Sequence, residues 1–452
     1  MRDAEGFESV VAAVRESVDP ASEEQERMEQ VVTALIERAE AVIEGLPVEA
    51  DVVRVGSTAR DTWISGDRDI DLFVRFPPSI DRAELEQYGL EVGHEVLPDG
   101  NEEYAEHPYV KSTVDSFDID LVPCYDVDDP ADIKSAVDRT PFHAQYIDER
   151  LDAELARDVR LTKQFFSGIG VYGSDLKTRG FSGYLTELLV LEYGGFRALI
   201  EAVAEWHPPV ELDPEEHGEE TFDDPLTVID PTDPNRNVAA VLSAENVARL
   251  QHYARKLLDD PSTDLFTPIE PDPLDEAALL VHLRNRGTTP VAIRFDAPDI
   301  VDDQLYPQLR RSESGIVEEL DRRGFDICRS RTFANETAVV FAELAVTKRP
   351  AIERHVGPPI HVRSHAEGFF EKYDDTDAYG PFLDGDRYVV ERAREYTTAA
   401  AFLNSEDIFT VRLGTHIEQA LEDGYNVLVG EDITALVDEF GVELAQYFEP
   451  TP

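Results

Sequence analysis

The sequence predicts an α+β protein that is divided into several domains. Segments 69–76 and 116–123 alternate polar and apolar residues, which is typical of half-buried strands. Other segments, such as 23–46, place apolar residues at helical spacing. Stretches rich in proline and acid at 207–237 and 259–275 interrupt these patterns. At 452 residues, the chain has room for two to four domains with substantial cores.

The composition is strongly acidic, with 95 Asp and Glu against 41 Lys and Arg and a formal charge of −54. The acid is spread along the chain, and 42% of the residues are hydrophobic, so disorder is excluded. Only seven of the basic residues are lysine, a balance that is similar to that of proteins from extreme halophiles. At about 1 M salt the Debye length is roughly 3 Å, so the net charge does not exclude an RNA partner.

Two cysteines, Cys124 and Cys328, are too few for a disulfide framework or a zinc site and fit a reducing compartment. The acidic N-terminus has no apolar core of a signal peptide. No apolar run approaches the roughly 18 residues of a membrane span. We therefore expect a soluble, cytoplasmic protein without a membrane partner.

The first third of the chain carries the most informative pattern. Residues 23–46 predict an amphipathic helix, with Ser22 and Gln25 as its capping box. A β-branched strand at 52–55 then breaks at Gly56 and Ser57. Asp69 and Asp71 follow two residues apart on a strand, so both carboxylates project from the same face. The intervening apolar residues point into a core.

Adjacent carboxylates repel each other, and a divalent cation would remove this cost. Mg²⁺ takes oxygen ligands and is commonly held by one or two carboxylates together with substrate phosphates. Asp120, on the second alternating segment, is the candidate for a third carboxylate, and Asp118 is the weaker choice. The alternative is that these are solvent-facing acids, because 95 acidic residues must produce chance pairs of this spacing.

The middle of the chain predicts helices. An apolar stripe runs through 140–166, and a glycine-rich turn leads into one long helix at 183–203. Residues 207–237 predict mostly surface linker, after which Ser243 caps another helix. Beyond 276, strands at 290–295 and 337–346 mix with a helix at 304–323, and no internal repeat is present.

The order of these motifs resembles the polymerase-β-like nucleotidyltransferases, and more closely the archaeal-type (class I) CCA-adding enzymes. The matching segments cover most of the chain: GSTARDTW at 56–63, DIDLF at 69–73, DLVPCY at 120–125, GFSGY at 180–184, DPTDPNRNVA at 230–239 and PDIVDDQLYPQL at 298–309. The resemblance implies a polymerase-β-like head with a mixed sheet, a helical neck, and α/β body and tail domains. The expected ranges are 1–140 for the head, 141–258 for the neck, 259–303 with 381–452 for the body, and 304–380 for the tail.

The resemblance also implies a function. Such an enzyme adds C, C and A from CTP and ATP to the 3′ end of tRNA without a nucleic-acid template. Asp69, Asp71 and Asp120 would be catalytic and would hold two Mg²⁺ ions, which stabilise the attacking and leaving oxygens of nucleotidyl transfer. The expected nucleotide-binding residues are Gly56, Ser57, Arg60, His143, Lys163, Tyr172, Arg179 and Arg236.

Each of these residues has an expected role and a plainer alternative. Backbone N–H groups at Gly56 and Ser57 can cradle a triphosphate, and Arg60 can clamp a phosphate oxygen. By resemblance, His143 and Lys163 face the triphosphate, Tyr172 lies under the sugar or base, and Arg236 reads the base. The alternatives are a capping Ser57, a solvated Arg60, a core histidine, a packing tyrosine, and an Arg236 salt bridge to Asp230 or Asp233.

The tRNA partner would be held along the acceptor stem and TΨC side, mainly through helix shape and 2′-hydroxyls. Rival functions are a poly(A) polymerase, an oligoadenylate synthetase, a catalytically silent tRNA-binding protein and a small-molecule nucleotidyltransferase. The segments at 230–239 and 298–309 favour CCA addition, and the three retained acids weigh against a silent protein. The sequence leaves open whether the chain forms a homodimer.

Overall fold

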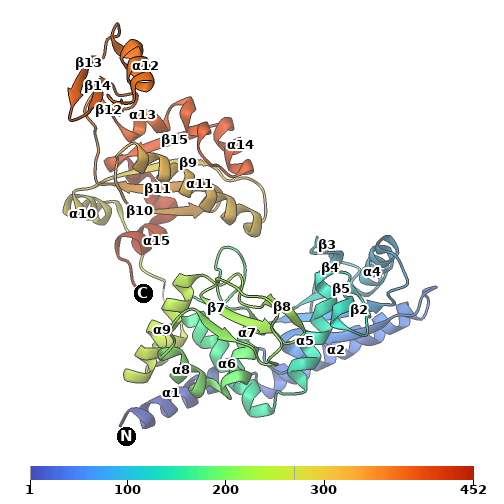
Figure 1. The fold of residues 1–452 in the computed structure, drawn as a ribbon. Helices are drawn as coiled ribbons and strands as arrows, with labels where there is room; N and C mark the ends of the chain where they lie inside the picture. The colour runs from blue at the N-terminus through green and yellow to red at the C-terminus, as the bar shows by residue number, and fades with distance from the viewer. Residues whose placement is uncertain (1, 269) are drawn as a thin grey trace. The chain divides into compact units, whose positions relative to one another are not determined.

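The computed structural model describes residues 2–268 and 270–452, and the chain divides near residue 270 into two compact units (Figure 1). Both units combine helices with sheets, so the predicted α+β class is confirmed. No helix within these described ranges is both long and apolar enough to cross a membrane.

The first unit begins with a five-stranded sheet in the order β1-β2-β5-β4-β3. Its central strands β2 and β5 are parallel and the other pairs are antiparallel, which makes the mixed sheet that the resemblance implied. The strands are β1 (Asp51–Val55), β2 (Asp69–Phe76), β3 (Asn101–Tyr104), β4 (Pro108–Val114) and β5 (Phe117–Tyr125).

One face of this sheet is covered by α2 (Ser22–Ile43) and α4 (Arg82–Val96). The buried residues of β2 on this side are Ile70, Leu72, Val74 and Phe76. Because side chains alternate along a strand, Asp69 and Asp71 project from the opposite face. The predicted Ser22 capping box is wrong, since Ala21 is the N-cap and no side chain caps the helix.

A second hydrophobic core, which we call the neck core, is formed by the helix that precedes the sheet in the sequence and the helices that follow it. It contains α1 (Arg2–Val18), so the N-terminal helix packs with the neck core although the sequence placed 1–140 in the head. The long helix predicted at 183–203 is two helices, because Gly194 and Gly195 adopt positive φ values of 76° and 127°. The other elements are η1 (Pro130–Asp132), η2 (Ala136–Arg139), α5 (Thr140–Asp148), α6 (Ala153–Gly168), α7 (Gly183–Tyr193), α8 (Phe196–Ala204), α9 (Ala244–Asp259) and η3 (Thr263–Phe266).

The prediction of mostly surface linker at 207–237 is wrong for the stretches 210–212 and 226–237. A three-stranded sheet forms there from β6 (Val210–Leu212), β7 (Leu226–Asp230) and β8 (Asp233–Asn237). Every residue of β7 is buried. The apolar run that opens β7 outweighs the flanking prolines and acids, because burying it against the neck core is favourable.

The second unit is built on an antiparallel sheet in the order β10-β11-β9-β15, with a hydrophobic core on each face. Its strands are β9 (Thr289–Asp296), β10 (Ile327–Ala334), β11 (Thr337–Leu344) and β15 (Tyr425–Val429). The surrounding helices are α10 (Glu276–Arg286), α11 (Asp302–Arg322), α13 (Ala399–Leu403), η4 (Glu406–Thr410), α14 (Thr415–Asp423), η5 (Gly430–Leu436) and α15 (Val437–Phe448).

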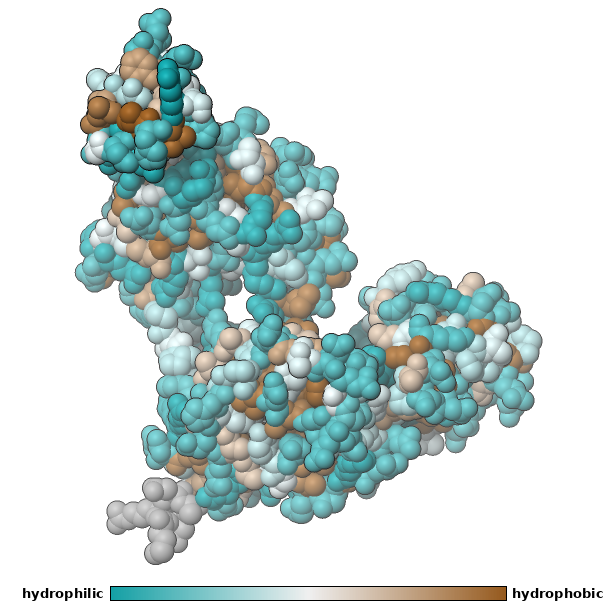
Figure 2. All heavy atoms as spheres, viewed as in Figure 1, coloured by the Kyte–Doolittle hydropathy of each residue, from teal (hydrophilic) through white to brown (hydrophobic). Residues whose placement is uncertain are grey.

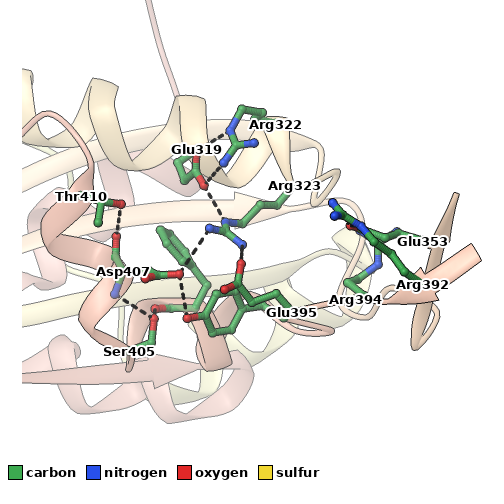
Figure 3. Close-up of polar contacts among 12 residues, drawn as sticks. Glu319, Arg322, Arg323, Glu353, Arg392, Arg394, Glu395, Ser405, Asp407 and Thr410 are labelled. Carbon is green, nitrogen blue, oxygen red and sulfur yellow. Dashed lines mark hydrogen bonds and ion pairs between the residues drawn. The ribbon is translucent and has the colours of Figure 1, made fainter. Parts of the chain in front are cut away.

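A smaller domain interrupts this unit. It contains β12 (Ile352–Pro359), α12 (Arg363–Tyr373), β13 (Tyr379–Asp384) and β14 (Arg387–Ala393). This small domain covers less than the expected tail range of 304–380. Helix α11 packs against the four-stranded sheet of the second unit, and β10 and β11 are strands of that sheet. The linking segments contact each other, since Arg349 N donates to the Thr397 carbonyl at 2.8 Å and Arg394 lies 3.5 Å from Glu353 (Figure 3).

Arginine also organises the body near this junction. Arg323, at the end of α11, pairs with Glu319 at 2.7 Å and with Glu395 at 3.3 Å (Figure 3). Its guanidinium lies over the ring of Phe402 at 4.5 Å. The planar guanidinium suits such a site, because it pairs with carboxylates at its edge and stacks on rings with its face.

The surface is largely hydrophilic, but apolar side chains gather on the small domain (Figure 2). Six of the nine large hydrophobic residues found exposed among those described belong to it: Ile352, Val356, Ile360, Tyr379, Phe382 and Leu383. Residues 346–394 also carry eight basic and nine acidic residues, so this segment is close to neutral in a chain of charge −54.

Candidate active site

Three carboxylates meet on the open face of the first sheet. The parallel register of β2 and β5 places Asp71 directly opposite Asp120, and Asp69 opposite Asp118. Paired residues in neighbouring strands project to the same side. The structure therefore brings Asp69, Asp71 and Asp120 together, as the alternating sequence pattern predicted. Asp118 accepts a hydrogen bond from Thr113 Oγ1 at 2.7 Å.

The electrostatics of this cluster are unfavourable without a cation. Burial, together with Asp120 and Asp69, raises the pKa of Asp71 to about 6. Burial and Asp67 likewise raise the pKa of Asp69. Two positive groups act against the shift at Asp71, Arg60 and Lys111. Lys111 lies on β4 opposite Asp120, and its Nζ is 3.1 Å from Asp120 Oδ1. At Asp69 and Asp71, burial and the neighbouring carboxylates therefore outweigh the nearby positive charge.

The donor set is chemically suited to Mg²⁺. All three groups offer hard carboxylate oxygens, and a divalent ion would offset the burial and repulsion that raise the pKa values of Asp69 and Asp71. The side chains share a face but are not arranged as ligands: in residues 2–268 and 270–452, no group of three His, Cys, Asp or Glu could hold a metal ion. The residues therefore fit the expected ion, while the coordination itself is not preformed.

Gly56 lies against this cluster. It begins the short helix α3 (Gly56–Ala59) with φ of 75°, and a Cβ atom added there would lie 2.1 Å from Asp71 Oδ2. Only glycine combines this backbone conformation with such a close approach. Ser57 follows, and its carbonyl accepts the Thr62 N–H at 3.0 Å, which closes the turn from Ser57 to Thr62.

Arg60, expected to clamp a phosphate, is held in a buried ion pair. Its Nε and Nη2 donate to the two carboxylate oxygens of Glu187 at 3.3 and 2.9 Å. Glu187 is 1% exposed and also accepts from Thr62 Oγ1 at 2.6 Å. The turn that follows Gly56 is thus attached to α7 by one carboxylate.

Lys163 supports the same turn from α6. Its buried Nζ donates to the Thr62 carbonyl at 2.9 Å, and burial lowers the pKa of this ammonium. Tyr172 lies next to the start of α7, where a Cβ added at Gly183 would be 3.3 Å from the tyrosine hydroxyl. Burial raises the pKa of Tyr172, so it stays protonated. Both predicted residues therefore lie beside the Gly56–Thr62 turn or the first turn of α7.

His143 and Arg236 meet at Asp230, the last residue of β7. His143 Nε2 and Arg236 Nη1 lie 2.8 and 2.6 Å from Asp230 Oδ2. The His143 ring stacks on Tyr184, with centroids 3.9 Å apart and planes at 12°. The salt bridge that was the plainer alternative for Arg236 is thus present, and it also joins Arg236 to His143.

Arg179 contributes to the structure through its backbone. It adopts φ of 52°, and its carbonyl accepts hydrogen bonds from Ser243 N and Asn246 Nδ2 at 3.0 and 2.9 Å. These contacts attach the glycine-rich turn before α7 to the start of α9. The described contacts give Arg179 a structural role and leave its expected nucleotide role a prediction.

The sequence analysis missed the roles of three residues that hold the site together, Thr62, Tyr184 and Glu187, and named Asp230 only as a possible salt-bridge partner of Arg236. Two signals were available. Glu187 is a charged residue inside the apolar run LTELLVL, and Asp230 ends the apolar strand LTVID. Buried charges are rarely tolerated unless they are paired, so an acid in such a run indicates a specific partner.

Comparisons with known proteins identify three regions. A nucleotidyltransferase domain matches residues 35–143, the second domain of tRNA nucleotidyltransferases matches 157–267, and the C-terminal domain of CCA-adding enzymes matches 286–430. The CCA-adding enzyme of Haloarcula marismortui is 60% identical over 99% of both chains. That of Halorubrum lacusprofundi is 58% identical over 99% of both chains. The CCA-adding enzyme of Methanoregula boonei is 42% identical over 95% of this chain and 93% of its own.

Proposed function

The chain belongs to the CCA-adding enzymes, the tRNA nucleotidyltransferases, and we propose that Asp69, Asp71 and Asp120 are its catalytic carboxylates. In this proposal the enzyme adds C, C and A from CTP and ATP to the tRNA 3′ end without a nucleic-acid template. The observation that carries the assignment is the parallel register that sets Asp71 opposite Asp120.

The three carboxylates would hold two Mg²⁺ ions. When bound, such ions stabilise the attacking 3′-hydroxyl oxygen and the departing pyrophosphate oxygen of an in-line displacement. The chain itself orients the substrates. Gly56 keeps the backbone clear of Asp71, while Glu187 and Lys163 fix the turn that carries Ser57 and Arg60.

The nucleotide would bind between this turn and the first turn of α7. Ser57, Arg60 and Lys163 supply hydroxyl, guanidinium and ammonium donors for the triphosphate side. His143 would also face the triphosphate, Tyr172 would lie under the sugar or base, and Arg236 would read the base. The first turn of α7 supports this arrangement, because Gly183 contacts Tyr172 and Tyr184 stacks on His143.

The tRNA acceptor stem and TΨC side are the proposed macromolecular substrate. The small domain supports this, because it is nearly neutral and carries exposed aromatic and aliphatic side chains. At molar salt, long-range steering by charge is screened, so short-range stacking and hydrogen bonds must supply the affinity.

The test is incorporation of labelled CTP and ATP onto tRNA that lacks CCA, in molar KCl with Mg²⁺. We expect ordered addition of C, C and A that then stops, and no addition by Asp71→Ala. Asp120→Asn should also be inactive, whereas the matched Asp118→Asn variant should keep most of its activity. Open-ended addition of A would instead identify a poly(A) polymerase, and tRNA binding without incorporation would identify a silent RNA-binding protein.

A further inference from the structure

One buried carboxylate joins two of the residues expected at the nucleotide. Asp230 is 0% exposed, and each of its oxygens has its own set of donors. Oδ2 accepts from His143 Nε2 and Arg236 Nη1. Oδ1 accepts from Thr232 N and Thr232 Oγ1, both at 2.9 Å, and from the Tyr184 hydroxyl at 3.4 Å. A carboxylate with this many donors is fixed in position and in turn fixes its partners.

The contacts determine how His143 is presented. An ionised carboxylate is acceptor-only, so the Nε2 atom of His143 must carry the proton that it shares with Asp230. Burial favours the neutral ring and lowers the pKa of His143. Its Nδ1 is then an acceptor. Stacking on Tyr184 sets the plane of the ring, so both the tautomer and the orientation of His143 are defined.

The contacts also constrain Arg236 without covering it. Only the Nη1 hydrogen bond to Asp230 links the two residues, and the Arg236 side chain remains 37% exposed. The guanidinium has five N–H donors in a rigid plane, so anchoring one nitrogen restricts the directions that the others can take. The remaining donors can therefore meet a base in a restricted range of orientations.

We propose that Asp230 is a positioning residue for nucleotide selection, which holds Arg236 and His143 in one fixed relation beside the bound nucleotide. This inference rests on the proposed function, since Arg236 must face the base for its orientation to matter. Asp230 itself acts through its partners and contacts no reacting atom. A simpler role would be structural, because the Thr232 contacts also close the turn between β7 and β8.

The two roles separate in a nucleotide-competition experiment with full-length protein in molar KCl. The measurement is kcat/KM for each of CTP, ATP, UTP and GTP on the appropriate tRNA lacking part of CCA. In Asp230→Asn, one uncharged amide oxygen replaces two carboxylate oxygens that each have their own donors, so Arg236 and His143 are no longer held together as firmly. We expect the preference for CTP and ATP over UTP and GTP to fall by about tenfold or more.

The matched control is Asp233→Asn on the neighbouring strand. Asp233 pairs with Arg139 at 2.9 Å and has no described contact with Arg236 or His143, so its substitution should leave the preference unchanged. In an Arg236→Ala background, Asp230→Asn should cause no further loss of preference, because the two changes remove the same interaction. An additive loss would contradict the proposal.

Thr232→Val provides a milder variant if Asp230→Asn does not fold. It removes one hydroxyl donor to Oδ1 and should reduce the preference by about fivefold or less, the equivalent of one ordinary hydrogen bond. An unchanged preference in every folded variant would overturn the proposal. So would an equal fall for all four nucleotides together with a lower melting temperature, which is the result expected of a structural role. Absence of C, C, A addition by the unmodified protein would instead contradict the proposed function.

Discussion

The acid cluster on β2 and β5 and the buried Asp230 are two aspartate sites with opposite electrostatics. At the cluster, burial and neighbouring carboxylates raise the pKa of Asp71 to about 6. At Asp230, burial alone would raise the pKa, but hydrogen bonds from His143, Thr232 and Arg236 outweigh it and hold the pKa below its usual range. Both sites lie in the first unit, so the difference arises from their immediate neighbours.

The comparison separates two uses of a carboxylate. Asp230 has all its donors within the chain and stabilises the arrangement of its neighbours. The carboxylates of Asp69, Asp71 and Asp120 have too few such donors within the chain. They therefore depend on an external cation, which is the behaviour expected of metal ligands. Active-site residues of this kind commonly reduce stability in return for function. Substitutions at the two sites should therefore change stability in opposite directions.

The largest effect is expected for Asp71→Asn. We predict at least about a thousandfold loss of kcat, since the two-metal step depends on this carboxylate for several kcal/mol of transition-state stabilisation. In Mg²⁺-free buffer at pH 7.5, the variant should nevertheless have a higher melting temperature than the unmodified protein. Differential scanning calorimetry in molar KCl measures this, with Asp118→Asn as the control.

The sign of that stability change follows from the raised pKa. The folded state binds the Asp71 proton more tightly than the unfolded state, so stability is lost as pH rises from about 4 through about 6. Removing the charge restores at most about 3 kcal/mol above that range and nothing below pH 4. A variant that melts lower than the unmodified protein at pH 7.5 would show that Asp71 is already compensated.

Glu187→Gln should reduce both nucleotide binding and stability. Breaking a buried pair by changing one partner typically costs about 3–5 kcal/mol, because the remaining charge of Arg60 stays buried. Release of the Thr62 turn should raise KM for CTP and ATP more than it lowers kcat. The exposed Glu192→Gln on the same helix is the control. An unchanged KM would mean that Arg60 does not need α7 to meet the nucleotide.

Asp230→Asn should destabilise the protein in a manner that depends on pH. Because the folded pKa is depressed, the stabilisation from the charged carboxylate is present above the unfolded value near pH 4 and is lost as pH falls below it. We expect a loss of about 3 kcal/mol at pH 7 that narrows below pH 4. Urea unfolding of both proteins between pH 3 and pH 7 measures this difference. If the difference in unfolding free energy between the two proteins stays constant over this pH range, the charge of Asp230 does not contribute to stability.

The sequence predicted the acid cluster well because period-two alternation is a local signal. The same pattern in 69–76 and 116–123 reported both strands, and their pairing placed Asp71 beside Asp120. The sequence offered only the nearby Arg236 as a partner of Asp230, because His143 lies 87 residues from Asp230 and Arg60 lies 127 residues from Glu187. The roles of these residues depend on tertiary contacts that no local sequence pattern contains.

The positions of some strands and the extent of the small domain were hard to predict for the same reason, because they depend on tertiary contacts. Strand β7 was hidden among prolines and acids, and its burial is decided by the neck core against which it packs. The expected tail range of 304–380 includes β10 and β11, which pair in the sheet of β9, because a local strand pattern does not show which sheet a strand joins. Pairing over long sequence separations, and not propensity, determines such boundaries.

The smallest effect is expected for Lys111→Gln, which tests whether the acid cluster has a built-in counter-ion. The Lys111 side chain is 44% exposed, so its pair with Asp120 should contribute less than about 1 kcal/mol, and less still in molar KCl. Chemical denaturation at low and high salt measures this contribution. A loss of several kcal/mol would mean that Lys111 neutralises the cluster much as Arg236 neutralises Asp230. A small loss would leave the three carboxylates dependent on a charge that the chain does not provide.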